Sequence, residues 1–461
     1  MKNYYNYKKI NDSYLITNDL GRSVFLSDEE FQLLNENESK LPLEKYTELT
    51  EKYFVYKEPK EIFSLKAGSE LREYKRYLFQ GTSLHIFVVT KNCNQHCIYC
   101  QASANNEKLE KMDNETAKRA VDLALCAPGK YLTFEFQGGE PLLNFETIKY
   151  IVEYTKEVNV EKNVEFVLVS NLLLLTEEML EFFVKNNVSI STSLDGDECL
   201  HNRNRPAGKL NVFEKWEKQF QQVKDSKLEI GAIQTTTKYT LNNYKELVDA
   251  YVSHGLDSLF IRPLTRLGYA AENWDTVGYT SEEFLEFYKN SLLYMIELCK
   301  NGTFISERHA SIFLSKILQY ESINYMELRS PCGGAIGQLA YYYNGDVYTC
   351  DEGRMLGEMG DKSFCLGNVY KSTYKELMKS PVCKTVAVSS CLENHKNCST
   401  CVYSPYCGTC PVISYALYGT IFPDLKEDFR CRVYQGILDI LFELILENDE
   451  STMKVLYDWV Y

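Results

Sequence analysis

The chain has 461 residues, of which 45% are hydrophobic and 25% are charged, so it can bury large cores and is not a disordered polymer. Its 50 Lys and Arg residues against 64 Asp and Glu residues give a net charge of −14, which argues against broad nucleic-acid binding. The polar start lacks the apolar core of a signal peptide, and no stretch approaches the roughly 20 apolar residues of a membrane span. These features predict a cytoplasmic protein with no nucleic-acid and no membrane partner.

Residues 1–60 are predicted to form a small domain of strands and helices. Residues 7–26 alternate in polarity and contain a turn signal, which is typical of a hairpin. Ser27, with Glu30 three residues later, marks the start of a helix, and a second short helix is expected at 43–52. A charged linker at 61–80 then leads to the next domain.

Apolar strand patterns alternate with helical patterns from residue 84 onward. The strands are expected at 84–90, 131–136, 164–170, 188–194, 229–235 and 258–263, and the helices between them at 114–125, 146–157, 177–185, 212–223 and 243–253. This repetition predicts the α/β class, with a parallel sheet that forms a partial (β/α)6 barrel at 81–265. A helical connector at 266–330, a Cys-rich region at 331–435 with little regular periodicity and a C-terminal helical segment at 436–461 complete the chain.

Sixteen cysteines without an export signal indicate metal or redox ligands. Cys93, Cys97 and Cys100 follow directly on the first barrel strand. Three thiolates on one loop can hold three irons of a 4Fe–4S cluster and leave the fourth iron open to a small molecule. A zinc site would want a fourth ligand, and the reach of His96 inside the loop is poor. The isolated cysteines are expected to be small buried residues; they are Cys126, Cys199 and Cys299.

A glycine motif follows the second barrel strand at Gly138, Gly139, Glu140 and Pro141. Two glycines allow close backbone approach to a ligand, and the carboxylate can face an ammonium group. Active sites of parallel barrels lie at this carboxyl edge of the strands, so the motif and the cysteine loop are expected to meet there.

The cysteine loop, with Tyr99 before its last cysteine, resembles the signature of the radical S-adenosylmethionine (SAM) enzymes. The resemblance implies that SAM binds the open iron, and that one electron from the reduced cluster generates a 5′-deoxyadenosyl radical that abstracts hydrogen from a C–H bond. It also implies that the glycine motif binds the amino group of SAM. Ser193 and Arg205 resemble the cofactor-contacting region after the fourth strand, although a strand cap and a surface ion pair are equally good interpretations.

The Cys-rich region resembles the SPASM extension, which holds two auxiliary 4Fe–4S clusters, so the resemblance implies three clusters in all. The implied ligands of one cluster, here named the first auxiliary set, are Cys332, Cys350 and Cys410. Those of the complete cluster, the second auxiliary set, are Cys398, Cys401, Cys407 and Cys431. The gap between Cys407 and Cys410 is two residues where three is usual.

Two features of this region leave alternatives open. The fourth ligand of the first auxiliary set is Cys365, Cys383 or Cys391, or that iron stays open to a substrate thiolate. Asp351 stands where an acid of related SPASM enzymes takes a proton from the substrate, and a capping or solvated acid is an equally good interpretation. A zinc-ribbon module is the alternative for the cysteines themselves.

The N-terminal domain resembles the winged-helix-like peptide-recognition domains of the pyrroloquinoline-biosynthesis type, whose open sheet edge binds a leader peptide as an added strand. A stabilising cap is the alternative. Most of residues 80–435 looks similar to peptide maturases of the His-Xaa-Ser-system and CXXX-repeat type, and the stretches that carry this resemblance are 83–90, 135–144 and 351–356. These resemblances imply an oxidoreductase that crosslinks a ribosomally made precursor peptide (a RiPP), through a Cys thioether or otherwise a C–C or C–O bond. A flavodoxin or ferredoxin is the implied electron donor.

Two other functions compete with this hypothesis. One is an anaerobic sulfatase-maturating-type oxidase, which has the same Cys-rich module, acts on a Cys or Ser and needs no leader-binding domain. The other, from a different class, is a non-catalytic zinc-binding interaction protein.

Overall fold

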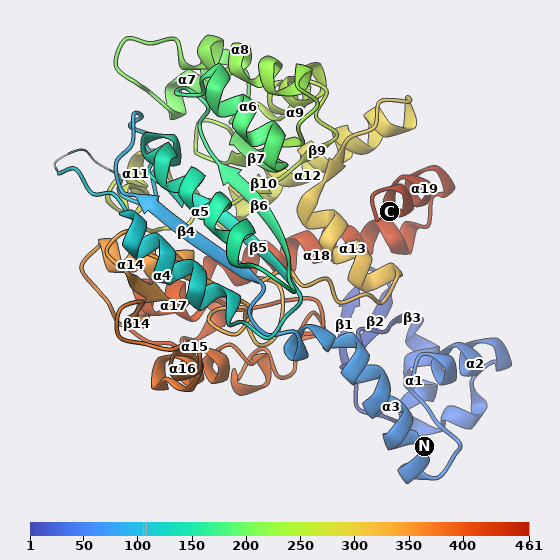
Figure 1. The fold of residues 1–461 in the computed structure, drawn as a ribbon. Coiled ribbons are helices and arrows are strands. Elements are labelled where there is room, and N and C mark those ends of the chain that lie inside the picture. Colours follow the sequence, from blue (N-terminus) through green and yellow to red (C-terminus); the bar gives the residue numbers. More distant parts are fainter. Residues whose placement is uncertain (105, 107, 461) are drawn as a thin grey trace.

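Six parallel strands occupy the six positions predicted from the sequence. The computed structural model describes residues 1–104, 106 and 108–460. The strands are β4 (Leu84–Thr90), β5 (Tyr131–Gly138), β6 (Asn163–Val169), β7 (Val188–Ser193), β8 (Ile230–Thr235) and β10 (Ile261–Arg262), with β9 (Ser258–Leu259) just before the last. They pair in chain order from β4 to β8, and β10 adds to β8. The predicted α/β class with an open, partial parallel barrel is confirmed (Figure 1).

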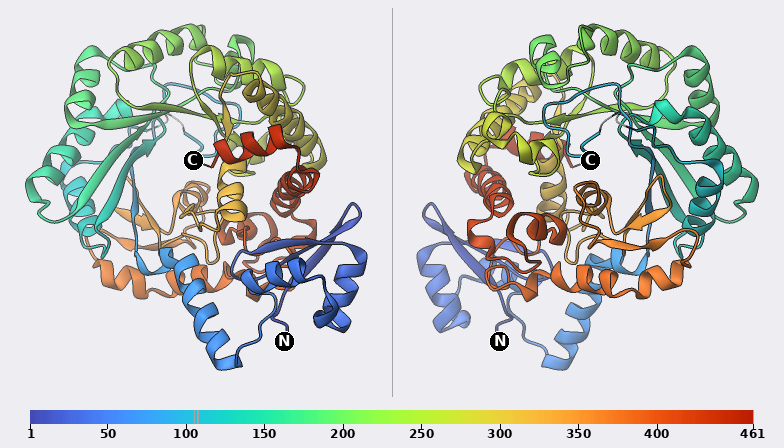
Figure 2. Two further views of the ribbon diagram at one scale, coloured as in Figure 1. Left: turned by 90° about the vertical axis from the view of Figure 1, so that its right-hand side faces the viewer. Right: turned by 90° about the vertical axis from the view of Figure 1, so that its left-hand side faces the viewer.

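The helices between these strands lie around the outside of the curved sheet. They are α4 (Asn114–Leu125), α5 (Phe145–Val158), α6 (Glu177–Asn186), α7 (Glu198–Asn204), α8 (Val212–Asp225) and α9 (Tyr244–Ser253). Each buries one apolar stripe against the sheet and leaves its polar face to solvent. Figure 2 shows this arrangement as a ring of helices around the strands, with the carboxyl ends of the strands gathered at one mouth.

Three further strands extend the sheet beyond β4, where the sequence predicted little regular structure. β12 (Gln338–Tyr341) pairs parallel to β4, and β13 (Asp346–Tyr348) and β14 (Cys365–Asn368) add antiparallel. All four residues of β12 are buried, so the strand shows no alternation that a sequence pattern could reveal. The same region contains α14 (Asp351–Glu358), α15 (Tyr374–Lys379), α16 (Pro381–Ser389) and α17 (Pro411–Tyr418).

The connector and the C-terminus are helical. The elements are α10 (Tyr269–Glu272), α11 (Trp274–Val277), α12 (Ser281–Lys300), β11 (Ser306–Glu307), α13 (Arg308–Leu318), α18 (Phe429–Glu447) and α19 (Glu450–Asp458). In Figure 2 the red helices α18 and α19 lie between the yellow connector helices and the blue N-terminal residues. In the described part of the chain, no helix combines the length and the apolar character needed to cross a membrane.

The N-terminal residues fold around a small core of their own. They form an antiparallel sheet of β1 (Asn6–Ile10), β2 (Ser13–Thr17) and β3 (Ser23–Leu26), followed by α1 (Asp28–Glu36) and α2 (Leu43–Glu51). The predicted Ser27–Glu30 capping box is present. The core includes Ile16, Val24 and Leu34. Helix α3 (Lys60–Tyr74) then occupies most of the segment expected as a linker.

One face of this N-terminal sheet packs on the Cys-rich region. The Thr17 hydroxyl donates to Val402 O (2.6 Å), and the Asn6 side chain donates to Cys401 O (3.2 Å). Lys8 pairs with the carboxylate of Asp439 on α18 at 2.6 Å. The N-terminal residues therefore support the loop that carries the second auxiliary set.

The aromatic core of the parallel sheet provides a test of the fold. Phe134 in β5 is fully buried, and its ring packs against Phe87 at 4.9 Å and Phe166 at 6.0 Å between centroids. Phe134→Ala should therefore lower the free energy of unfolding by about 3–5 kcal/mol in a urea titration. Tyr131 begins the same strand but is 74% exposed, so Tyr131→Ala should cost less than about 0.5 kcal/mol. Equal losses for the two variants would contradict this core.

Candidate functional site

The three-cysteine loop follows β4 directly and is fixed by backbone bonds to the segment after α7. The N–H of His96 donates to Pro206 O (2.9 Å), and the N–H of Ile98 donates to Asn204 O (3.0 Å). The loop thus lies at the carboxyl edge of the parallel strands, where barrel active sites are expected.

The thiols of this loop lie close enough to affect one another's ionisation. Burial raises the pKa of Cys93 and raises that of Cys97 to about 12, and the neighbouring Cys100 thiol adds to both shifts. Buried thiols that oppose one another's ionisation become thiolates when a metal supplies positive charge. The donor set therefore fits the iron–sulfur cluster that the three cysteines would hold.

The two glycines at the end of β5 let its exit pack directly on the exit of β4. A Cβ atom added to Gly138 would lie 2.2 Å from Thr90 O, and one added to Gly139 would lie 2.3 Å from Asn92 O. The Gly139 N–H donates to Thr90 O (3.0 Å), and the Glu140 N–H donates to Asn92 O (2.8 Å). The sequence predicts that these glycines allow the close approach of a ligand. In the structure, the backbone that approaches them is that of the cysteine loop.

Glu140 is a buried carboxyl group, 1% exposed, at the centre of this contact. It accepts hydrogen bonds from the Leu142 N–H (3.0 Å), the Asn171 N–H (2.8 Å) and the Ser170 hydroxyl (2.8 Å). Burial outweighs these donors and raises its pKa to about 7. A ligand ammonium beside it would favour the charged carboxylate. Pro141 starts the short helical turn that follows.

Asp195, two residues after the end of β7, binds the residues on the opposite side of the loop. This fully buried carboxylate accepts from the Tyr99 hydroxyl (2.7 Å), from Nε of Arg205 (2.9 Å) and from the Thr235 N–H (3.2 Å). The partner of Arg205 is thus an internal acid and not a surface one. Sequence reasoning missed this role, although an acid directly after a predicted barrel strand was its signal.

These groups surround a first cavity of about 240 Å³. Of the predicted site residues, the cavity brings together Cys93, Cys97, Tyr99, Cys100, Gly138, Gly139, Glu140, Ser193 and Arg205. Pro141 and Asp351 do not line it. Lining residues outside the predicted site include Asn171, Thr235, Arg262 and Met355.

The seven cysteines of the SPASM-like region fall into two groups of neighbouring thiols. Burial raises the pKa of every one of them, and thiols within a group raise one another's pKa further. One group is Cys332, Cys350 and Cys410. The other is Cys398, Cys401, Cys407 and Cys431. They coincide with the first and second auxiliary sets, and their thiols fit iron clusters by the same argument as the first loop.

The three candidates for the missing ligand have other neighbours. In the described structure, the charged neighbours that shift the pKa of Cys365, Cys383 and Cys391 all lie outside the first auxiliary set. The carboxyl group that raises the pKa of all three of its thiols is that of Glu352, whose own pKa is raised by burial. Among all the residues that the structure describes, no three His, Cys, Asp or Glu side chains are arranged as ligands of one metal ion.

The cysteines outside these groups differ in exposure. Cys126 and Cys199 are exposed, and Cys299 is half-buried. The prediction that all three are small buried residues is therefore wrong for the first two.

Asp351 is the first residue of α14 and lies toward the barrel. Its carboxylate accepts from Nε of Arg354 (3.1 Å) and from a second guanidinium nitrogen. Asp351 also contributes to raising the pKa of Glu135, a half-buried carboxyl of β5 whose pKa reaches about 6 mainly through desolvation. The same helix places Met355 at the wall of the first cavity. Helix α14 therefore links that cavity to the first auxiliary set.

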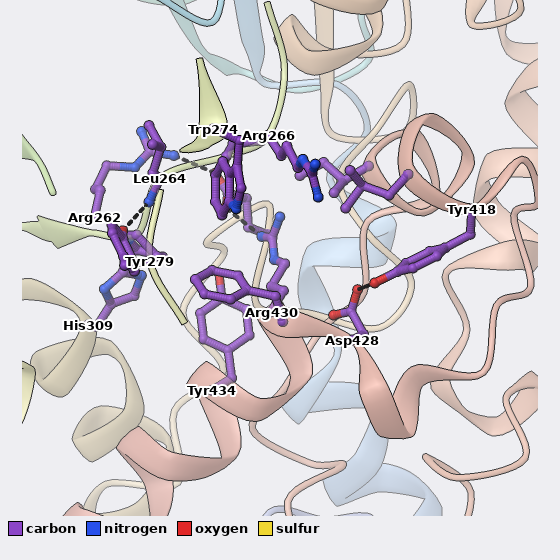
Figure 3. A pocket seen from close by; sticks show the side chains of 16 residues that line it. Arg262, Leu264, Arg266, Trp274, Tyr279, His309, Tyr418, Asp428, Arg430 and Tyr434 are labelled. Carbon is purple, nitrogen blue, oxygen red and sulfur yellow. Dashed lines mark hydrogen bonds and ion pairs between the residues drawn. The ribbon is translucent and has the colours of Figure 1, made fainter. Parts of the chain in front are cut away.

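A second cavity of about 260 Å³ adjoins the first. Arg262, Pro263 and Thr265 line both cavities. Figure 3 shows aromatic rings from the connector and from α18 around it, together with arginines. Arg262 and Arg430 both donate to the carboxylate of Glu327, at 2.9 and 2.6 Å. Such a mixture of aromatic walls and a few placed charges is typical of sites for organic ligands.

Comparisons with known proteins agree with this site. Residues 87–250 match the family model described as the Radical SAM superfamily. The cysteine-type anaerobic sulfatase-maturating enzyme of Clostridium perfringens (strain 13 / Type A) is 25% identical over 378 residues, which cover 79% of this chain and 97% of that protein.

Two solved structures share the fold. Native anSMEcpe with bound AdoMet and Kp18Cys peptide superposes with a TM-score of 0.67 at 23% identity, and covers 79% of this chain and 98% of that one. Streptococcus suis SuiB bound to the precursor peptide SuiA has a TM-score of 0.56 at 14% identity, and covers 90% of this chain and 96% of that one.

The matched family segment runs from β4 to α9, so it contains the cysteine loop, the glycine motif and Asp195. The cysteine loop and the glycine motif both line the first cavity, so much of its wall comes from the matched segment. Residues 87–250 therefore resemble the radical SAM superfamily, and the chain is similar over most of its length to a sulfatase-maturating enzyme.

Proposed function

We propose that this enzyme installs an intramolecular crosslink, most simply a Cys thioether and otherwise a C–C or C–O bond, in a ribosomally synthesised precursor peptide. The observation that carries the proposal is the junction of the two cavities at Arg262, Pro263 and Thr265. A peptide side chain in the second cavity would reach the first cavity there. Arg430 on its far wall lowers the pKa of Cys410, so the first auxiliary set is also close.

The proposed cofactors are SAM and three 4Fe–4S clusters, with a flavodoxin or ferredoxin as electron donor. When bound, SAM and the first cluster supply the radical that removes a hydrogen atom from a peptide carbon. The thiols of the cysteine loop would hold the cluster, and Glu140, Ser193 and Arg205 would border SAM. We assign leader recognition to residues 1–60, radical chemistry to 81–265 and auxiliary clusters to 331–435.

Thioether formation joins a peptide carbon to a Cys sulfur with the loss of two hydrogens. One leaves as a hydrogen atom, and the other leaves as a proton and an electron. Asp351 would take the proton, because it lies between the barrel and the first auxiliary set and Arg354 fixes its orientation. The auxiliary clusters would take the electron. A substrate thiolate at an open iron of the first auxiliary set would place the sulfur for bond formation.

The outer edge of β3 is the proposed site for the leader. Within the described structure this strand pairs only with β2, and the outward carbonyls of Ser23 and Phe25 accept from Lys52 (3.0 Å) and Lys45 (3.2 Å) of the adjoining helix region. Ammonium groups on flexible side chains are easily displaced by the backbone N–H groups of an added strand. The near-complete coverage by the SuiB fold, which binds a precursor peptide, supports this assignment.

The sulfatase-maturating-type oxidase is the second candidate, and a specific observation favours it. The curated relative of that activity matches this chain over nearly its whole length. That length accounts for only 79% of the present chain, however, so a substantial part here has no counterpart in that enzyme. The N-terminal residues fit that additional part, and we therefore prefer the leader-dependent maturase.

The first prediction concerns the radical centre. Cys97→Ala should abolish the formation of 5′-deoxyadenosine by the anaerobically reconstituted enzyme and lower its iron from about twelve to about eight per chain. Cys126→Ala is the control, since Cys126 is an exposed thiol outside all three sets. Colourless anaerobic wild-type protein, or full deoxyadenosine output from Cys97→Ala, would refute the radical mechanism.

The second prediction concerns the product. Reduced enzyme with SAM should lower the mass of its precursor peptide by two hydrogen atoms per modification, and a thioether should leave one Cys thiol fewer open to alkylation. Asp351→Asn should keep deoxyadenosine formation but slow the mass loss about 100-fold, as expected for loss of a proton acceptor. Asp361→Asn, on an exposed loop, serves as its control. Deoxyadenosine without any mass loss, or oxidation of a leaderless Cys or Ser peptide, would favour the oxidase.

The third prediction concerns the leader. Ser23→Pro removes an outward N–H of β3 and is tolerated at an edge strand, so it should weaken binding of a labelled leader peptide about tenfold in fluorescence anisotropy. Ser23→Ala keeps that N–H and should bind as wild type does. Equal binding by both variants would show that the leader does not pair with β3.

A further inference from the structure

Two buried cations in the Cys-rich half of the molecule lack a carboxylate partner. Lys316 is 1% exposed and Arg329 is 2% exposed. Among the residues that the structure describes, neither forms an ion pair. Lys316 donates to Tyr406 O (2.9 Å) and to Leu328 O, and Arg329 donates through Nε to Pro331 O (3.2 Å). Carbonyl oxygens solvate a cation only in part, so its charge remains uncompensated.

The Arg329 guanidinium is the less satisfied of the two groups. A second of its nitrogens donates to the Asn324 side chain, but its buried Nη2 has no hydrogen-bond partner among the described atoms. The guanidinium also lies over the ring of Tyr77, 4.7 Å from its centroid. A ring face attracts a cation but does not replace a counter-ion.

The two cations lie next to each other and next to the auxiliary sets. Burial lowers the pKa of Lys316, and the positive charge of Arg329 lowers it further. The Cys407 thiol acts to raise the pKa of Lys316, and the Cys332 thiol acts to raise the pKa of Arg329. Lys316 is therefore close to the second auxiliary set, and Arg329 is close to the first.

A small cavity of about 40 Å³ confirms this neighbourhood, because Lys316, Arg329 and Cys398 all line it. The acids that border the same cavity are Asp19 and Glu393. Glu393 pairs instead with Lys75 at 3.4 Å, and neither acid comes within ion-pair distance of the two cations in the described structure. Two like charges buried side by side therefore lack the anion that such a site requires.

We propose that Lys316 and Arg329 are the counter-charges of the two auxiliary clusters, Lys316 for the second set and Arg329 for the first. This inference rests on the cofactors of the proposed function. A 4Fe–4S cluster with thiolate ligands is anionic, and it gains one more negative charge when it accepts one electron. A fixed cation nearby favours that reduced state, because solvent is excluded and Coulomb interactions are strong. The pair would thus help both clusters to accept the electron released by crosslinking.

The test is an EPR-monitored redox titration with dithionite as the reductant. The background is full-length protein with Cys93, Cys97 and Cys100 changed to Ala, so that only the auxiliary clusters contribute. Lys316→Met should make reduction of the second-set cluster at least about tenfold less favourable, which is about 59 mV for one electron. Arg329→Met should have the larger effect on the first-set cluster, and Arg329→Lys should restore most of it.

Lys289→Met is the matched control, because Lys289 lies on α12 with a side chain 51% exposed. It should leave both midpoints unchanged. If Lys316→Met does not fold, Lys316→Gln keeps a hydrogen-bond donor while removing the charge and should show the same shift. Unchanged midpoints in the charge-neutral variants would overturn the inference and leave the two residues with a structural role only.

Iron and sulfide analysis separates this failure from failure of the proposed function. Background protein without auxiliary clusters would overturn the proposed cofactor set, and the inference with it. Background protein with both clusters, but with midpoints insensitive to Lys316 and Arg329, would overturn the inference alone.

Discussion

The backbone contact between the exits of β4 and β5 determines how the cysteine loop lies against the glycine motif. Gly138 and Gly139 have no Cβ atoms, so the carbonyls of Thr90 and Asn92 can approach within hydrogen-bond distance. Larger residues at either glycine would move the cysteine loop away from Glu140. The two motifs are thus one structural unit, which explains why they occur at consecutive strands.

The parallel pairing of β12 with β4 positions the Cys-rich region, as the glycine contact positions the cysteine loop. It makes the Cys-rich region a continuation of the same sheet and not a separate appendage. Because β13 and α14 follow at once, Cys350 and Asp351 are held at the wall of the barrel. The second cavity then forms between residues of the connector and of α18, which approach from the other side.

The sequence predicts the repetitive part of this structure well. The barrel strands and their helices begin and end within a residue or two of the expected positions, because amphipathic periods and caps are local signals. β12 was missed because a short strand that is buried on both faces has no period. The second cavity was missed for a different reason. Its walls come from distant segments, such as Arg262, Glu327 and Arg430, and only the fold brings them together.

Charge is balanced differently in the two halves of the molecule. In the barrel, the buried Arg205 is paired with the buried Asp195, so that pair is stable without any ligand. In the Cys-rich half, Lys316 and Arg329 face thiols in place of carboxylates. Thiols become suitable counter-ions only when a metal holds them as thiolates. With the proposed auxiliary clusters bound, folding of this half would therefore be coupled to cluster binding more tightly than folding of the barrel. The N-terminal sheet contacts the Cys401 backbone, so it would share in that coupling.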